Sequence, residues 1–553
     1  MNADLQRIAE EYWEFVLEEN PTQALMLGDH RYDDRFEDFS RSAEDATIAR
    51  LDTYTAAATA IDPATLTADE QVTREVLIFE TTSNSRLLSH RAAEMAVSHT
   101  IGIQAILPVQ IPQYPLTEPQ HAQAMPARFR GIATAFDAAT DRLRDGLAAG
   151  RTPIRSTAEK TIAQVDRYLA AALDDDALLR LKSPANWDGE PGWRASMERV
   201  VADEVRPAIK KWRDMIEAEV LPAGRSDDKP GLCHLSGGDD MYAAALFRYT
   251  TTDITPDEIH DIGLAQIDSL ADEYRTLGLQ ALGTDQLDDI FSRLRDDASL
   301  HFTSGPPIVA AAEKAMAKAK AAMGDWFGRL PQADCTVMET PSGPTAFYFR
   351  PAADGSRPGI FFVNTENPAR WGTFEIEAMS YHEGIPGHHL QLAIAMELEG
   401  IPEFRKNAFI AAYGEGWGLY TERLADEMGL YSSPLERLGM LSADSMRAGR
   451  LVVDTGLHAK GWTRQQAIDY FTANSPMSQG TIEGEVDRYI SFPGQATSYM
   501  IGRLEIQRMR REAEATMGAR FSITGFHDTV LGSGLVPLST LDRLVSEWAG
   551  STA

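Results

Sequence analysis

Helix signals recur along most of this chain. The segment 128–150, with the sequence RFRGIATAFDAATDRLRDGLAAG, places apolar residues three and four positions apart and ends in glycine. Thr255 and Glu258 have the spacing of a capping box at a helix start, and Thr463 and Gln466 repeat it. The sequence therefore predicts a mainly α-helical protein.

One short region departs from the helical pattern. Residues 346–364, AFYFRPAADGSRPGIFFVN, contain two aromatic and β-branched runs around an Asp354-Gly355 turn signal. This arrangement predicts a small antiparallel hairpin. An exposed strand edge can pair with an extended peptide. A surface hairpin that binds nothing is the equal alternative.

The length of 553 residues favours two packed lobes over one core. Loop-like breaks occur at 183–193, 221–240 and 330–346. We expect an N-terminal helical lobe over 1–228 and a C-terminal helical lobe over 229–553. The second lobe would hold the hairpin and a metal site within 382–415. One continuous domain is the alternative.

The charge balance limits the classes of partner. The chain has 52 Lys and Arg against 82 Asp and Glu, which gives a formal net charge of −30. Such a surface repels polyanions, so we expect neither nucleic acid nor an acidic membrane face as a partner.

The cysteine count and the start of the chain bear on location. Cys233 and Cys335 are the two cysteines, too few for a disulfide scaffold. The segment MNADLQRIAEEYWEFVLEEN lacks the basic start and apolar run of a signal peptide, and no stretch resembles a membrane span. We expect a cytoplasmic protein, unless processing has already removed a leader.

The stretch 381–389, YHEGIPGHH, carries the most chemistry. In H-E-x-x-H motifs, two histidines four residues apart share a helix face and bind one zinc ion. Here proline stands four residues after His382, and the next histidines are His388 and His389. An unbroken helix would place neither of them well for a shared metal ion.

Pro386 makes an unbroken helix untenable. Its ring clashes with the carbonyl four residues earlier, and glycines flank it on both sides. We expect a helix over 373–383, a bulge over 384–387 and a second helix that begins at His388. The bulge would return His388 to the face of His382; His389 is the reserve ligand.

Acidic residues downstream complete a catalytic metal site. Glu415 and Glu422 lie seven residues apart in a helical segment and share a face. We expect Glu415 to bind the metal and Glu422 to orient a ligand histidine. Glu383, next to His382, would accept the proton of an attacking water molecule. Polar residues satisfied in a helix corner are the alternative.

Four ordered blocks, YHEGIPGHHLQ, YGEGWGLYTERLADEMG, RLVVDTGLHAKGW and SFPGQATSYMIGRLEI, resemble the signatures of the bacterial proteins known as domain of unknown function 885. Looser similarity at NPTQALMLGDH, YTTTDITPDEIHDIGL and RPGIFFVNT extends the resemblance over nearly the whole chain. That family is considered related to gluzincin-type zinc metallopeptidases, which include thimet oligopeptidase, angiotensin-converting enzyme and Taq carboxypeptidase.

The resemblance implies a multi-helix, saddle-like metallopeptidase fold with a deep cleft and one zinc ion. It places the two histidine ligands on His382 and His388, the catalytic acid on Glu383 and the glutamate ligand on Glu415. The chain differs from the relatives by the two extra residues of its motif.

Later residues could assist catalysis. Gln495, Tyr499 and Arg503 share one face of an expected helix. Tyr499 could donate to an oxyanion, and Arg503 could bind a substrate carboxylate or form an ion pair with a neighbouring acid. Asp454 and His458, also four residues apart, fit either a supporting role near the cleft or a buried tether.

Two functional hypotheses follow. The first is a zinc-dependent hydrolase of peptide bonds that acts on short peptides with Glu383 as general base. The second is a catalytically inactive peptidase-like scaffold that binds a peptide or small ligand in its cleft, because the Pro386 insertion could dismantle the metal site.

Overall fold

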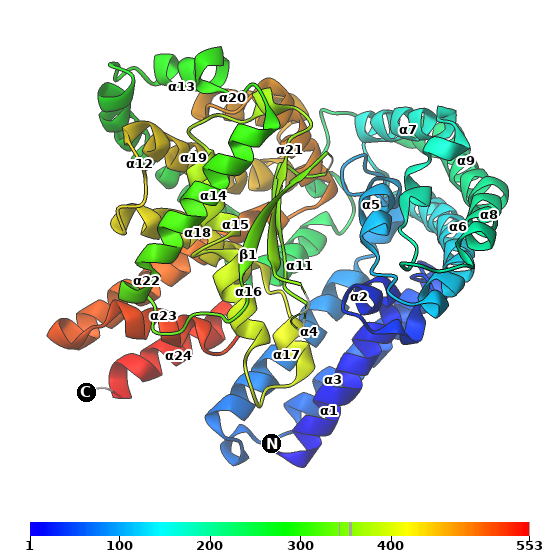
Figure 1. The fold of residues 1–553 in the computed structure, drawn as a ribbon, viewed down its shortest axis with the longest axis horizontal. Coiled ribbons are helices and arrows are strands. Elements are labelled where there is room, and N and C mark those ends of the chain that lie inside the picture. Colours follow the sequence, from blue (N-terminus) through cyan, green and yellow to red (C-terminus); the bar gives the residue numbers. More distant parts are fainter. Residues whose placement is uncertain (342, 353–354, 356, 552–553) are drawn as a thin grey trace.

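The computed structural model describes residues 1–341, 343–352, 355 and 357–551. It is a mainly α-helical protein with one small three-stranded sheet (Figure 1). This agrees with the fold class that the helix signals predict.

The helices of the first 220 residues lie on the right and along the bottom of Figure 1. They are α1 (Ala3–Glu19), α2 (Pro21–Met26), α3 (Arg41–Thr59), α4 (Ala68–Ser89), α5 (Ile103–Gln110), α6 (Pro119–Ala148), α7 (Arg155–Ala170), α8 (Glu190–Val200) and α9 (Arg206–Met215). Short π-helical turns join α8 to α9 and α9 to α10 (Leu221–Ala223).

The helices that surround the site come later in the chain. Before the sheet come α11 (Gly238–Thr250), α12 (Pro256–Ala281), α13 (Leu287–Asp296) and α14 (Gly305–Ala322). After it come α15 (Ile376–Glu383), α16 (His388–Met396), α17 (Glu403–Asn407), α18 (Ala411–Glu427), α19 (Pro434–His458), α20 (Arg464–Asn474), α21 (Gln479–Ser491), α22 (Ser498–Met517), α23 (Ile523–Leu531) and α24 (Leu538–Ser551).

The predicted helix starts are confirmed by reciprocal capping bonds. The Thr255 hydroxyl accepts from the backbone N–H of Glu258, and the Glu258 carboxylate accepts from the backbone N–H of Thr255. Thr463 and Gln466 make the same pair of bonds at the start of α20. Local polar residues therefore determine where these helices begin.

The sheet contains the predicted hairpin and one additional strand. β2 (Ala346–Phe349) pairs antiparallel with β3 (Gly359–Asn364), as expected. β1 (Cys335–Thr340) pairs parallel with β3 on its other side, so the sheet is mixed, in the order β1-β3-β2. Gly355 has φ +74°, as a turn requires, and Asp354 lies outside the described residues.

The expectation that 330–346 is a loop is therefore wrong for β1. The segment CTVMET is half-exposed, and its turn-rich flanks give a loop signal. Its strand conformation depends on hydrogen bonds to β3, about twenty residues away in the chain, and no local pattern reports that pairing.

Residues from both ends of the chain share one hydrophobic cluster. Buried side chains of α1, α3 and α4, such as Tyr12 and Leu77, belong to the same cluster as Trp417 of α18 and Ile506 of α22. A second cluster joins α6 to α9 and includes Phe136 and Trp212, whose ring centroids lie 5.4 Å apart. The first cluster also includes Tyr381 of α15 and Leu390 of α16.

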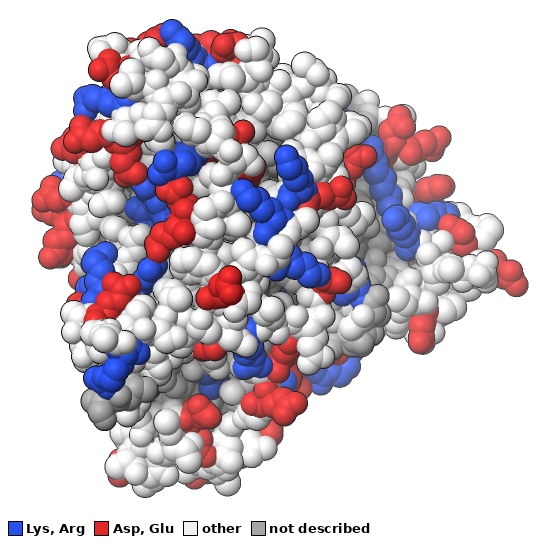
Figure 2. Space-filling view, turned by 60° about the vertical axis from the view of Figure 1, so that its left-hand side comes forward, with Lys and Arg blue, Asp and Glu red and all other residues white. Residues whose placement is uncertain are grey.

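Figure 2 shows one face of the surface, where acidic and basic side chains alternate without a continuous basic stripe. In the described part of the chain, no helix is both long and apolar enough to span a lipid bilayer.

Candidate metal centre

The helix that carries His382 ends where proline and glycine predict. α15 ends at Glu383 and α16 begins at His388, so the predicted pair of helices is confirmed, although α15 starts at residue 376 rather than 373. The Trp417 indole N–H of α18 donates to the carbonyl of Pro386 at 3.0 Å and so fixes the intervening turn. A Cβ at Gly387 would lie 1.9 Å from the carbonyl oxygen of His382, a space that only glycine allows.

This turn brings His382, His388 and Glu415 together. Nε2 of His382 lies 3.7 Å from Oε2 of Glu415, and Nε2 of His388 lies 3.4 Å from the same oxygen. The two imidazole rings are 4.8 Å apart between centroids and nearly perpendicular. Two histidines six residues apart thus face one point, with a carboxylate from α18 as the third member.

The spacing of these three groups fits a single zinc ion. Ligand atoms about 2.0–2.2 Å from a tetrahedral metal lie about 3.3–3.6 Å from one another. One ligand atom from each of the three residues falls within 4.8 Å of the other two. The set of two imidazoles and one carboxylate leaves a fourth position open, as in catalytic zinc sites.

Glu422 supports the cluster from behind. Its Oε1 accepts a hydrogen bond from Nδ1 of His382 at 2.8 Å, which directs Nε2 toward Glu415. Burial by itself lowers the pKa of His382, but the hydrogen bonds to Glu415 and Glu422 outweigh it and raise the pKa to about 9. The two carboxylates therefore favour a positive charge at this position.

His389, the reserve ligand, is directed elsewhere. Its Nδ1 pairs with the Tyr348 hydroxyl at 2.9 Å, and its Nε2 lies 3.0 Å from the carbonyl oxygen of Ala333. Burial lowers its pKa to about 4, so the ring is neutral. Both nitrogens are engaged with the sheet region, whereas His388 faces Glu415.

The cluster opens onto a cavity of about 470 Å³. Glu383 and Tyr499 both line this cavity. Among the described residues, the Glu383 carboxylate has no hydrogen-bond or ion-pair partner, so it is free to accept a proton. The Tyr499 ring lies 6.4 Å from that of His382, within the same cavity. Burial raises the pKa of Tyr499, which keeps its hydroxyl protonated.

The hairpin forms another wall. Ala346, Phe347 and Tyr348 of β2 line the cavity, and β2 has a strand neighbour on one side, β3. The edge strand of the predicted hairpin therefore lines the same cavity as His382, His388 and Glu415.

The other residues selected from the sequence lie outside the cluster. Arg503 pairs with Asp444 and donates to Gln266 at 3.1 Å. Gln495 accepts from Arg488 at 2.7 Å.

Asp454 and His458 are buried tethers, and each has partners of its own. Asp454 accepts from the Tyr242 hydroxyl at 2.6 Å and from the backbone N–H of Gly494 at 3.0 Å. His458 bonds through Nδ1 to the N–H of Leu232 and through Nε2 to a backbone carbonyl.

Three arginines that line the cavity were not predicted as site residues from the sequence. Arg447 and Arg450 of α19 and Arg488 of α21 line the cavity together with Tyr499. The spacing of three between Arg447 and Arg450 places them on one helix face, but charged pairs of that kind are common on exposed helices. Their burial depends on helices that are distant in the sequence.

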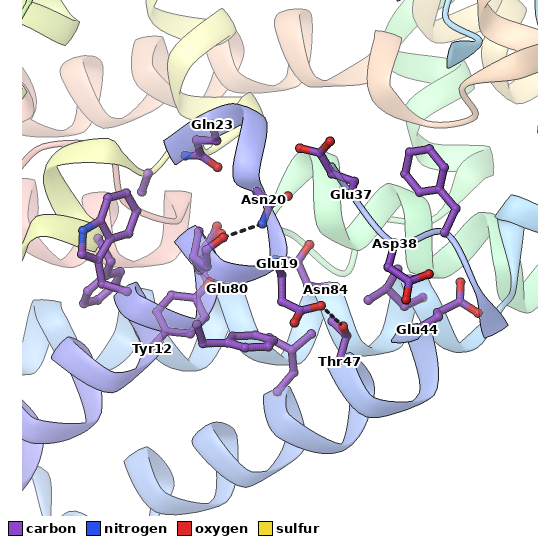
Figure 3. A pocket seen from close by; sticks show the side chains of 18 of the residues that line it. Tyr12, Glu19, Asn20, Gln23, Glu37, Asp38, Glu44, Thr47, Glu80 and Asn84 are labelled. Atoms are coloured by element: carbon purple, nitrogen blue, oxygen red, sulfur yellow. Dashed lines mark hydrogen bonds between the residues drawn. The ribbon is translucent and has the colours of Figure 1, made fainter. Parts of the chain in front are cut away.

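A larger cavity of about 570 Å³ is bounded by α1 to α4 and by residues 404–409 (Figure 3). Carboxylates gather around it, and Thr47 donates to Glu19 at 2.9 Å. Phe409 lines both cavities. Among the described residues, none of those selected from the sequence lines this cavity, whereas His382, Glu383, His388, Glu415 and Tyr499 line the smaller one.

A comparison with known protein families shows to which family the chain belongs. Residues 21–545 match the model of a family described as bacterial protein of unknown function (DUF885). The chain belongs to this family. The resemblance in the four sequence blocks is thereby confirmed at the level of the family. No curated protein matches the chain.

Two solved structures share the fold. A candidate lipoprotein from Colwellia psychrerythraea is 24% identical with a TM-score of 0.92, and each chain is covered completely. A candidate lipoprotein of unknown function from Shewanella oneidensis is 18% identical with a TM-score of 0.77, over 98% of this chain and 100% of that one. At these identities the likeness concerns the fold alone.

Proposed function

We propose that this DUF885 protein is a metal-dependent hydrolase of peptide bonds. The convergence of His382, His388 and Glu415 at one point carries the proposal. The relation to gluzincin peptidases, and their saddle-like architecture with a deep cleft, belong to the same proposal. The predicted cytoplasmic location and the expected absence of nucleic-acid and membrane partners stay predictions.

The two histidines and Glu415 would hold one zinc ion. When bound, zinc polarises a carbonyl and lowers the pKa of water. Glu383 accepts the proton of the attacking water and returns it to the leaving amine. Tyr499 donates a hydrogen bond to the oxygen on which negative charge develops. Glu422 keeps His382 oriented throughout.

The cavity supports short, extended peptides as substrates. Its volume of about 470 Å³ suits a few residues, and residues of the edge strand β2 form part of one wall. A peptide can add to such an edge as a further strand. This would place a backbone carbonyl beside the metal cluster.

The test compares metal content with activity. We expect the purified protein to contain one zinc per chain and to cleave members of a short-peptide library, as followed by mass spectrometry. Glu383→Gln keeps the metal and lowers kcat by at least about 100-fold, because it removes the general base.

Exposed Glu399 provides the matched control, since Glu399→Gln changes the same chemical group away from the cavity. A parent protein that cannot bind zinc would refute the hydrolase and leave the ligand-binding scaffold as the function.

A further inference from the structure

Three buried or half-buried arginines line the cavity beside His382, His388 and Glu415. Arg447 and Arg450 are 5% and 6% exposed, and Arg488 is also largely buried. Guanidinium groups stay charged in proteins, so burial on this scale calls for anionic partners.

Glu383, Glu415 and Glu485 also line this cavity, but among the described residues Glu485 is the one of them that bonds these arginines. Glu485 is shared, since both Arg450 and Arg488 donate to its Oε2 at 2.8 and 3.1 Å. Glu422 lies 3.8 Å from Arg447 but is hydrogen-bonded to His382. Nη1 of Arg450 and Nε of Arg447 are buried and have no hydrogen-bond partner among the described residues. Two guanidinium nitrogens of the cavity wall are thus left without a partner among the described residues.

The arginines lie close to the reacting groups. The Tyr499 ring is 6.4 Å from the His382 ring and 4.6 Å from the Arg450 guanidinium. An extended peptide advances about 3.4 Å per residue, so about one to three residues would separate the metal cluster from a group held by Arg450.

Nε and Nη2 of Arg450 are used by Tyr489 and Glu485, so Nη1 of Arg450 and Nε of Arg447 are the donors left for an anion. We propose that these arginines form a subsite for a substrate carboxylate about one to three residues from the scissile bond. This subsite extends the proposed hydrolase function, and calling its ligand a substrate rests on that proposed function. It gives the arginine wall the carboxylate-binding role that the sequence suggested for Arg503, whose guanidinium is paired with Asp444.

Binding to the chelator-treated full-length protein tests the subsite independently of catalysis. The probes are N-acetyl-Ala-Ala-Phe as free acid, the same peptide as C-terminal amide, and N-acetyl-Ala-Ala-Glu amide, all measured by calorimetry. We expect the free acid to bind at least about tenfold more tightly than its amide, about 1.4 kcal/mol. If the glutamate amide matches the free acid, the site accepts a side-chain carboxylate; if it binds like the phenylalanine amide, the site requires the chain terminus.

Variants then test whether Arg450 and Arg488 cause the preference for the free acid over the amide. Arg450→Gln and Arg488→Gln should each reduce the ratio of acid to amide affinity toward one, whereas Arg144→Gln, an exposed arginine paired with Glu219, should leave it unchanged. Equal binding of acid and amide by the parent, which needs no variant to fold, would overturn the proposal. A preference that survives in both folded arginine variants would also overturn it. A protein that hydrolyses no peptide but prefers the acid would refute only the hydrolase.

Discussion

Glu422 accepts a hydrogen bond from Nδ1 of His382 and is 1% exposed, so its charge acts on the ligand ring with little screening by water. Glu422→Gln preserves size and an accepting oxygen but removes that charge. We expect zinc affinity to fall about 10–100-fold, as for other carboxylates that orient ligand histidines. Competition with a fluorescent chelator measures the change.

Glu427 provides the matched control on the same helix. It pairs with Arg510 near the surface, so Glu427→Gln should leave zinc affinity at the parent value. Unchanged affinity in Glu422→Gln would show that the hydrogen bond, rather than the charge, orients His382.

At the scale of the element, α18 must approach α15 closely to deliver Glu415. A Cβ at Gly418 would lie 2.8 to 3.0 Å from three atoms of the His382 ring. Gly418→Ala favours the helix by up to about 1 kcal/mol through propensity but displaces this ring. We therefore expect weaker zinc binding while the helical circular dichroism of the folded protein is retained.

Gly484 in α21 is the control for the same substitution. A Cβ there meets nothing within 4 Å, so Gly484→Ala should keep zinc affinity and gain stability of up to about 1 kcal/mol. If Gly418→Ala binds zinc as tightly as Gly484→Ala, the close approach of α18 does not position His382.

The break between α15 and α16 was predictable because it is local. Pro386 and its flanking glycines act on the backbone within one turn, so the sequence alone indicates where the first helix must end. The choice of His388 over His389 was less secure, because it depends on Tyr348 of β2, which bonds His389. β1 and the arginine wall depend on partners far along the chain and carried no local signal.

At the scale of the whole molecule, α19 lies within the C-terminal helices, with nearly every residue from Leu438 to His458 buried. Two of its aspartates are fully buried and have opposite surroundings. Asp454 faces the Tyr242 hydroxyl and a backbone N–H, whereas Asp444 pairs with Arg423 and Arg503. Within the described part of the chain, Asp454 thus has no cationic partner in hydrogen-bond contact, whereas Asp444 has two.

These surroundings predict opposite dependences of stability on pH. Burial raises the pKa of Asp454 from its ordinary 3.8 to about 7, against the hydrogen bonds from Tyr242 and Gly494. Its contribution to folding is therefore complete below pH 3.8 and is lost as the pH rises through about 7. For Asp444, burial alone would raise the pKa, but Arg423 and Arg503 outweigh it and hold the pKa below 3.8. Its contribution is present above pH 3.8 and is lost as the pH falls through the lower folded value.

Asp454→Asn should therefore be more stable than the parent at pH 8, by no more than about 4 kcal/mol, since one pKa unit corresponds to about 1.4 kcal/mol. The difference should shrink toward pH 5, because the parent then carries the proton itself. Asp444→Asn should instead be less stable than the parent at both pH values, because it leaves Arg423 and Arg503 without their shared anion. Urea unfolding of the three proteins at pH 5 and pH 8 gives the comparison. If the free energy of unfolding changes equally between pH 5 and pH 8 for the parent and for Asp454→Asn, Asp454 is ionised in the folded protein.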